Sequence, residues 1–210
     1  MPDGPPTRDY FTLFDEPRRP WIDPDRLKQK YVALSAGLHP DRVHHLGDAE
    51  RGQAHERSAE LNAAYRCLSE PRERLRHLLE LERGAAPADI QRVPPELMDL
   101  SLEVAFACRQ ADALAREKGR TQSALLKAQL FERSVTEIER LDALRKKLSR
   151  WQQELAAALK EVDEAWQLPA SDNPSERARL LERIEEIRQL ESYRFRWQSQ
   201  LGERAVQLAV

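Results

Sequence analysis

The 210-residue sequence predicts an all-α protein, in which an N-terminal helical hairpin precedes a C-terminal three-helix antiparallel bundle. Two features of the whole chain favour this class. Charged residues make up 33% of the sequence and aromatic residues 6%, which is typical of amphipathic helices that expose one face to water. Apolar residues recur every three or four positions through most of the chain, and no stretch has the pattern of a strand.

The distribution of proline and glycine divides the chain into four parts. Residues 1–8 are rich in proline and are predicted to form a disordered tail, whereas residues 9–84 contain the helices of the hairpin. Residues 85–95 hold several prolines and few side chains that could build a core, which indicates a linker. Residues 96–210 are then predicted to form the bundle.

The first long helix has a clear start and a clear end. Asp23 is a suitable N-cap, and Pro24 fits the first helical position. Pro40 ends the helix because it disfavours helical geometry at the residue before it. The expected apolar face consists of Leu27, Tyr31, Leu34 and Leu38. The chain then turns at the tripeptide His39-Pro40-Asp41, directly after a basic amphipathic helix.

The second half of the hairpin follows a polar segment. Residues 42–54 contain two glycines and are predicted to be a loop. The next helix has the expected apolar face Ala59, Leu61, Tyr65 and Leu68. Pro71 interrupts or restarts this helix, and Gly84 is the expected C-cap of the continuation. The continuation carries its leucines at positions 75, 78, 79 and 81. The two main helices should pack as an antiparallel pair.

The predicted bundle has three apolar patterns in sequence order. The first consists of Leu97, Leu100, Val104, Cys108 and Ala111, and the periodicity weakens near residues 117–120, where a break is expected. From Leu141 a heptad pattern runs through Leu141, Leu144, Leu148, Trp151, Leu155, Ala158, Val162 and Ala165. After a turn at residues 169–174, capped by Asn173, the last face holds Leu180, Ile184, Ile187, Leu190, Trp197, Leu201 and Leu208. Short connections between long helices predict antiparallel packing.

Three stretches of the N-terminal part carry a family resemblance. They are Asp9–Phe14, the helix and turn Asp25–Arg42, and Ser58–Leu68 followed by Pro71, Arg74, Leu78 and Leu79. These stretches resemble the J domain, and within it the HscB-type co-chaperones of iron–sulfur cluster assembly. The resemblance covers residues 9–84. It implies a protein that activates a DnaK/HscA-type ATPase chaperone, performs no bond chemistry itself and uses no cofactor.

The resemblance also implies which residues contact the ATPase. These are His39, Pro40, Asp41, Arg26, Lys28, Lys30 and Arg42. The cations would speed the encounter with a negative surface, and Pro40 would reduce the entropy lost on docking. Asp41 would pair with an arginine of the partner, and His39 would hydrogen-bond at the same contact. A solvated helix face is the alternative interpretation of Arg26, Lys28 and Lys30.

A second resemblance begins at Pro95. The run from Pro95 to Leu100 is similar to the start of the family's C-terminal bundle, whose first helix contacts an iron–sulfur scaffold protein. The candidate contact residues are Leu97, Met98, Asp99, Leu100, Glu103 and Phe106. Burial inside the bundle is the alternative for their apolar members. Glu103 stands one residue away from the family's acidic position, so a J-domain co-chaperone with a different client is a second hypothesis.

Other classes of function find little support. A net charge of −2 argues against bulk nucleic-acid binding, and no arrangement of residues indicates an enzyme. His44, His45 and His55 lack the spacing of a zinc site, so we expect no metal. Cys67 and Cys108 fit helical apolar patterns and are interpreted as buried hydrophobes.

The expected setting is the cytoplasm. The first residues lack the apolar core of a signal peptide, and no apolar run approaches the roughly 20 residues needed to span a bilayer. We expect a monomer. The alternative is an interaction protein with a degenerate J domain, in which the heptads from Leu141 to Ala165 form an intermolecular coiled coil.

Overall fold

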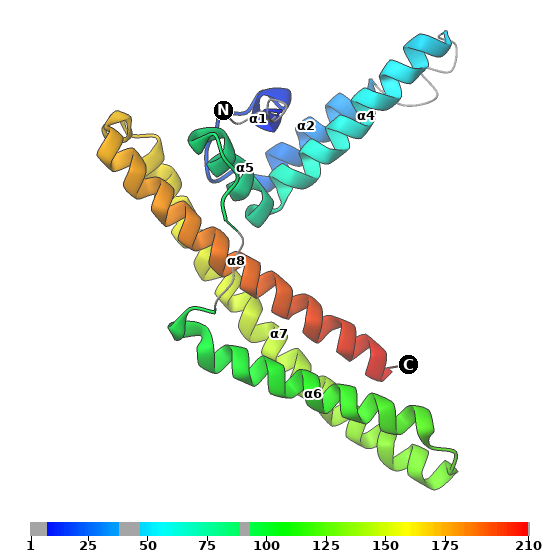
Figure 1. The fold of residues 1–210 in the computed structure, drawn as a ribbon. Helices are drawn as coiled ribbons and strands as arrows, with labels where there is room; N and C mark the ends of the chain where they lie inside the picture. Colours follow the sequence, from blue (N-terminus) through cyan, green and yellow to red (C-terminus); the bar gives the residue numbers. More distant parts are fainter. Residues whose placement is uncertain (1–7, 38–46, 89–92, 210) are drawn as a thin grey trace. The chain divides into compact units, whose positions relative to one another are not determined.

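The computed structural model describes residues 8–37, 47–88 and 93–209 (Figure 1). The tripeptide at 39–41 and Arg42 lie outside these ranges. The elements, in order, are α1 (Tyr10–Leu13), α2 (Pro24–Ala36), α4 (Asp48–Ser69), α5 (Pro71–Arg83), η1 (Pro95–Leu97), α6 (Met98–Arg120), α7 (Ala124–Trp166), η2 (Pro169–Asp172) and α8 (Pro174–Ala209). Every element in the described ranges is a helix, which confirms the all-α class.

The chain forms two compact units. Unit 1 combines residues 1–88 with 158–188, and unit 2 combines residues 89–157 with 189–210. Helices α7 and α8 therefore contribute to both. This division differs from the sequence division into 9–84, 85–95 and 96–210, because the end of α7 and the start of α8 pack on the core of the N-terminal helices. The domain bounds drawn from the sequence stay a prediction.

The core of unit 1 joins helices that are distant in sequence. Its largest fully buried side chains include Phe11, Phe14, Leu27, Leu68, Leu75, Leu78, Leu79, Ile184 and Ile187. Figure 1 shows α2 and α4 side by side as an antiparallel pair, which confirms the predicted hairpin. The pair is therefore one part of a larger core that α1, α5, α7 and α8 complete.

Helix α2 begins as predicted but buries less of its apolar face. The Asp23 carboxylate accepts hydrogen bonds from the backbone N–H groups of Asp25 and Arg26 at 3.0 and 2.9 Å. Leu27 is buried, but Leu34 is 43% exposed, so its predicted burial is wrong. Figure 1 shows α4 alongside the second half of α2, and one neighbouring helix cannot cover that half completely.

Helix α4 begins earlier than predicted. The expected loop 42–54 is wrong for its last seven residues, because α4 starts at Asp48. Gly47 is the N-cap, and its N–H donates to the Glu50 carboxylate at 3.2 Å, which satisfies a free backbone donor at the helix start. Ala59 is exposed, contrary to prediction, and Ala54 and Ala64 are buried in its place.

The later boundaries of unit 1 agree with the sequence. Helix α4 ends at Ser69 and α5 starts at Pro71, as the predicted restart requires. Gly84 follows α5 with a φ of 70°, and its N–H donates to the carbonyl of Glu80 at 2.9 Å. Glycine suits this C-cap because it adopts left-handed backbone geometry without a Cβ clash.

Unit 2 contains the antiparallel bundle. Helix α6 ends at Arg120, where the periodicity weakens, and α7 returns beside it from Ala124 (Figure 1). The second part of α8 completes a core formed by Val104, Cys108, Ala111, Leu114, Leu130, Leu141, Leu144, Leu148, Tyr193, Trp197, Leu201 and Leu208. The heptad leucines of α7 thus pack inside the chain, which opposes the intermolecular coiled-coil alternative.

The described residues supply two further findings. No helix among them is long and apolar enough to cross a membrane.

Cys67 is half-buried and Cys108 is buried, and both are free thiols, as predicted. Burial raises the pKa of the Cys67 thiol to about 12 and also raises the pKa of Cys108.

A matched pair of leucine substitutions in α7 tests the bundle core. Leu148→Ala removes a fully buried side chain and should lower the free energy of unfolding by about 2–5 kcal/mol. Leu125→Ala, at a position that is 71% exposed, should cost less than about 0.5 kcal/mol. Urea denaturation followed by circular dichroism measures both values. Equal losses would contradict the described packing of α7.

Candidate functional site

The three candidate cations of α2 have different surroundings. The Lys30 ammonium donates to the carbonyls of Phe14 and Asp15 at 3.0 and 2.7 Å and lies 2.7 Å from the Glu16 carboxylate. The Arg26 guanidinium lies 3.2 Å from the same carboxylate. Lys28 is exposed, and it has no ion pair with the residues that the structure describes. Two of the three cations therefore contact one buried acid.

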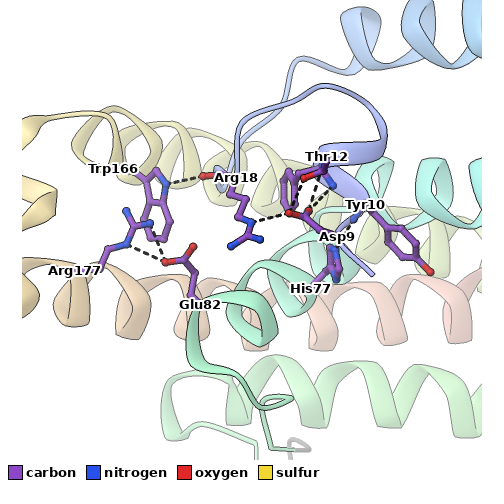
Figure 2. Close-up of polar contacts among 9 residues, drawn as sticks. Asp9, Tyr10, Thr12, Arg18, His77, Glu82, Trp166 and Arg177 are labelled. Atoms are coloured by element: carbon purple, nitrogen blue, oxygen red, sulfur yellow. Dashed lines mark hydrogen bonds and ion pairs between the residues drawn. The ribbon is translucent and has the colours of Figure 1, made fainter. Parts of the chain in front are cut away.

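Helix α1 and the segment after it place that acid. Asp9 caps α1 by accepting from the N–H of Phe11 at 2.9 Å and from the Thr12 hydroxyl at 2.9 Å (Figure 2). The Nε of Arg18 also donates to Asp9, with 2.8 Å between Nε and Oδ2. Burial alone would raise the pKa of Asp9, but hydrogen bonds from Arg18 and Thr12 outweigh it and lower the pKa.

His77 of α5 fastens the start of α1. Its Nε2 accepts a hydrogen bond from the backbone N–H of Tyr10 at 3.1 Å (Figure 2). Its ring also stacks on Phe11, with 5.7 Å between the ring centres. The imidazole is buried, and this burial lowers the pKa of His77. A neutral ring is required here, because a protonated Nε2 could not accept from Tyr10.

A second set of contacts holds the following segment against the ends of α7 and α8. Arg19 makes a bidentate pair with the buried Asp163, and the Trp166 indole donates to the carbonyl of Arg18 at 2.9 Å. The Arg177 guanidinium lies 3.3 Å from the centre of the Trp166 ring and pairs with Glu82 at 2.9 Å (Figure 2). These contacts are polar and charged, so sequence periodicity gave no sign of them.

The candidate scaffold residues separate into buried and exposed groups on α6 and the turn before it. Leu97 is buried and Leu100 is half-buried, whereas Met98 and Phe106 are 46% and 42% exposed. Leu102 is 59% exposed between them, and sequence reasoning missed it. Met98, Leu102 and Phe106 recur every four residues, which is the signal that could have revealed this α6 apolar stripe.

Charged residues of α7 flank the α6 apolar stripe. Glu103 pairs with Lys147 at 2.8 Å, and the Arg140 guanidinium lies 4.9 Å from the centre of the Phe106 ring. Asp99 is exposed. Beside the stripe is a hollow of about 370 Å³, lined by Leu97, Leu100, Lys147, Arg150, Trp151 and Glu154. The predicted acidic contact Glu103 thus already has a partner within the chain.

The residues that the structure describes contain no candidate metal site. Within them, no three side chains of histidine, cysteine, aspartate or glutamate gather as a metal site requires. His39, His44 and His45 lie outside those ranges.

Comparison with known proteins gives one consistent result. No protein-family model matches the chain. It is 28% identical over 180 residues to the "Co-chaperone protein HscB homolog" of Azoarcus sp., covering 85% of this chain and 90% of the relative. It is 32% identical over 177 residues to the protein of the same name from Cupriavidus taiwanensis, covering 84% of this chain and 89% of the relative.

Two solved structures are also similar. The chaperone HscB from Vibrio cholerae aligns with a TM-score of 0.49 and 22% identity, covering 92% of this chain and 99% of that one. The human co-chaperone protein HscB aligns with a TM-score of 0.47 and 19% identity, covering 91% of this chain and 85% of that one.

The neutral state of His77 predicts a dependence of stability on pH. As the pH falls from about 7.5 to about 5.5, the unfolded chain protonates this histidine while the folded chain resists, because its pKa is lowered. The free energy of unfolding should therefore fall through this range. Urea denaturation at several pH values should show a smaller fall in His77→Gln. His55→Gln, which changes an exposed histidine of α4, is the control and should keep the wild-type slope.

Proposed function

The chain belongs to the HscB co-chaperone family, and on this basis we propose that it stimulates the ATPase of a DnaK/HscA-type chaperone and delivers an iron–sulfur cluster scaffold protein to it. The observation that carries the proposal is the position of His39-Pro40-Asp41, directly after α2 in a capped antiparallel pair with α4. Anchoring on both sides by packed helices lowers the entropic cost of docking for the residues that join them. The chain itself performs no bond chemistry in this proposal.

The proposed contact with the ATPase combines the tripeptide with charge on α2. Asp41 pairs with an arginine of the ATPase, so that docking is linked to the catalytic state of the partner. His39 hydrogen-bonds at the same contact, and Pro40 limits the conformations of the turn. Arg42 and the exposed cations of α2 raise the rate of encounter with a negative surface. Each of these steps stabilises one conformation of the ATPase without entering its chemistry.

The proposed contact with the scaffold protein is the α6 apolar stripe. Three large apolar side chains exposed on one helix face are typical of a binding surface, and methionine adapts its shape to a partner at low cost. Asp99 borders this face and supplies an acidic contact. Leu97 and Leu100 support the stripe from within the bundle.

One observation favours a second function, a J-domain co-chaperone with a different client. Glu103 is held by Lys147, and Arg140 covers one face of Phe106, so the surface beside the stripe is less acidic than the resemblance implies. A client with a different charge would suit it. The monomeric state and the cytoplasmic location belong to either version of the proposal.

The deciding experiment measures the ATPase rate of the host's DnaK-type chaperones with this protein, with and without the scaffold protein. We expect stimulation that rises synergistically when the scaffold is present. His39→Gln should reduce stimulation to the basal rate while circular dichroism shows unchanged helicity. Full stimulation by this variant would refute the J-domain mechanism, and stimulation that ignores the scaffold would favour the second function.

A substitution on α6 tests the scaffold contact separately. Leu102→Asp places a charge in the α6 apolar stripe and should weaken the scaffold's apparent affinity by about tenfold or more. Stimulation in the absence of scaffold should not change. Val206→Asp, at an apolar α8 position that is 66% exposed, is the matched control and should leave the synergy intact. Equal effects of the two variants would rule out a specific role for the stripe.

A further inference from the structure

The buried acid Glu16 makes the two sides of α2 differ in the charge that they offer to the ATPase partner. We infer that Glu16 offsets one of the two positive charges of Arg26 and Lys30, so that α2 meets the ATPase mainly through the flank that carries Lys28 and the apolar Val32. This inference rests on the proposed ATPase contact and adds to it the residues that determine its charge.

Glu16 lies beside two cations and offsets one of their two positive charges. Only 3% of its side-chain surface is exposed. Its carboxylate lies 2.7 Å from Lys30, whose side chain is 27% exposed, and 3.2 Å from Arg26, whose side chain is 59% exposed. Lys30 is engaged further by two backbone carbonyls, those of Phe14 and Asp15. A buried carboxylate needs such partners, because an isolated charge in a protein interior is very costly. Lys30 therefore serves the fold and cannot leave Glu16 without a large penalty.

The backbone around Glu16 is built to hold it in place. The Glu16 N–H donates to the carbonyl of Phe11 at 3.0 Å, and Asp15 adopts a φ of 48°. A non-glycine residue in this left-handed region is strained and persists only where its surroundings enforce it. The enforcing contacts are those of α1, which Asp9 caps and His77 fastens (Figure 2). Glu16 is therefore part of a rigid turn.

The other flank of α2 remains open. Lys28, Val32 and Ser35 follow one another at spacings of four and three residues, so they share one side of the helix. At about 100° per residue, Arg26 lies about 160° around the helix from Lys28. Val32 is 57% exposed, and Lys28 is exposed as well. This open flank runs along the helix that leads directly into the tripeptide.

The open flank defines the chemistry of its partner. One cation beside one apolar side chain fits a surface with a single carboxylate next to an apolar patch, because a strongly acidic surface would leave most of its charges unpaired. Since Glu16 offsets part of the positive charge of α2, the dependence of docking on salt should be shallow. Removing the charge of Glu16 should make the dependence of docking on salt steeper.

The test is the concentration of this protein that gives half-maximal ATPase stimulation, measured at about 50 mM and about 500 mM salt, where the screening length falls from about 14 to about 4 Å. We expect Lys28→Gln and Val32→Asp to raise this concentration about fivefold or more at low salt. Lys30→Gln should lower Tm but change the half-maximal concentration less than about twofold. Glu16→Gln should lower the concentration about threefold at low salt, with no difference at high salt.

The controls separate this inference from the function on which it rests. Glu132→Gln, at an exposed position of α7 in unit 2, changes the net charge by the same amount and should behave as wild type. Lys28 and Val32 are exposed, so their variants decide the matter even if Glu16→Gln unfolds. The inference is overturned if Lys28→Gln and Val32→Asp give the wild-type half-maximal concentration. It is also overturned if Lys30→Gln is folded and raises this concentration as much as Lys28→Gln does. A wild-type protein without stimulation would instead overturn the proposed function.

Discussion

The buried carboxylate of Asp163 is the contact on which the assembly of unit 1 depends. It accepts two hydrogen bonds from Arg19, one from the backbone N–H of Trp21 and one from Gln167, and its residue is only 2% exposed. The hydrogen bond with Asp163 raises the pKa of Arg19. A buried ion pair stabilises only where its remaining bonding capacity is filled, and here backbone and side chains fill it. The apolar core beneath can then close around α1, α5, α7 and α8.

Local chemistry made much of the fold predictable. The starts of α2 and α8 followed from an acceptor side chain before proline, at Asp23 and Asn173, and the end of α5 followed from Gly84. The start of α4 was missed because Gly47 is a cap without a side chain. The contacts of α7 and α8 with the N-terminal helices could not be read from the sequence, because they join segments about 140 residues apart, as in the pair of Arg19 with Asp163. No short-range sequence pattern predicts contacts between residues so far apart in the chain.

The sequence could identify the candidate site residues, but it could not show how they are arranged. The sequence grouped Arg26, Lys28 and Lys30 because they are close neighbours on the chain, but helical geometry and Glu16 separate them. Leu102 was missed because no family position indicated it, although its exposure distinguishes it from the buried Leu114 of the same helix. Exposure is a tertiary property, and amphipathic periodicity predicts it only where one face is purely polar.

The state of the two thiols matters for a protein that would handle iron–sulfur assembly. Iron binds the thiolate, and only a minute fraction of Cys67 is deprotonated near neutral pH when its pKa is about 12. Cys108 is shifted in the same direction by its burial. Burial thus disfavours the thiolate form of both cysteines. A protein whose thiols are held in the protonated form has little tendency to withdraw iron from a cluster carrier beside it.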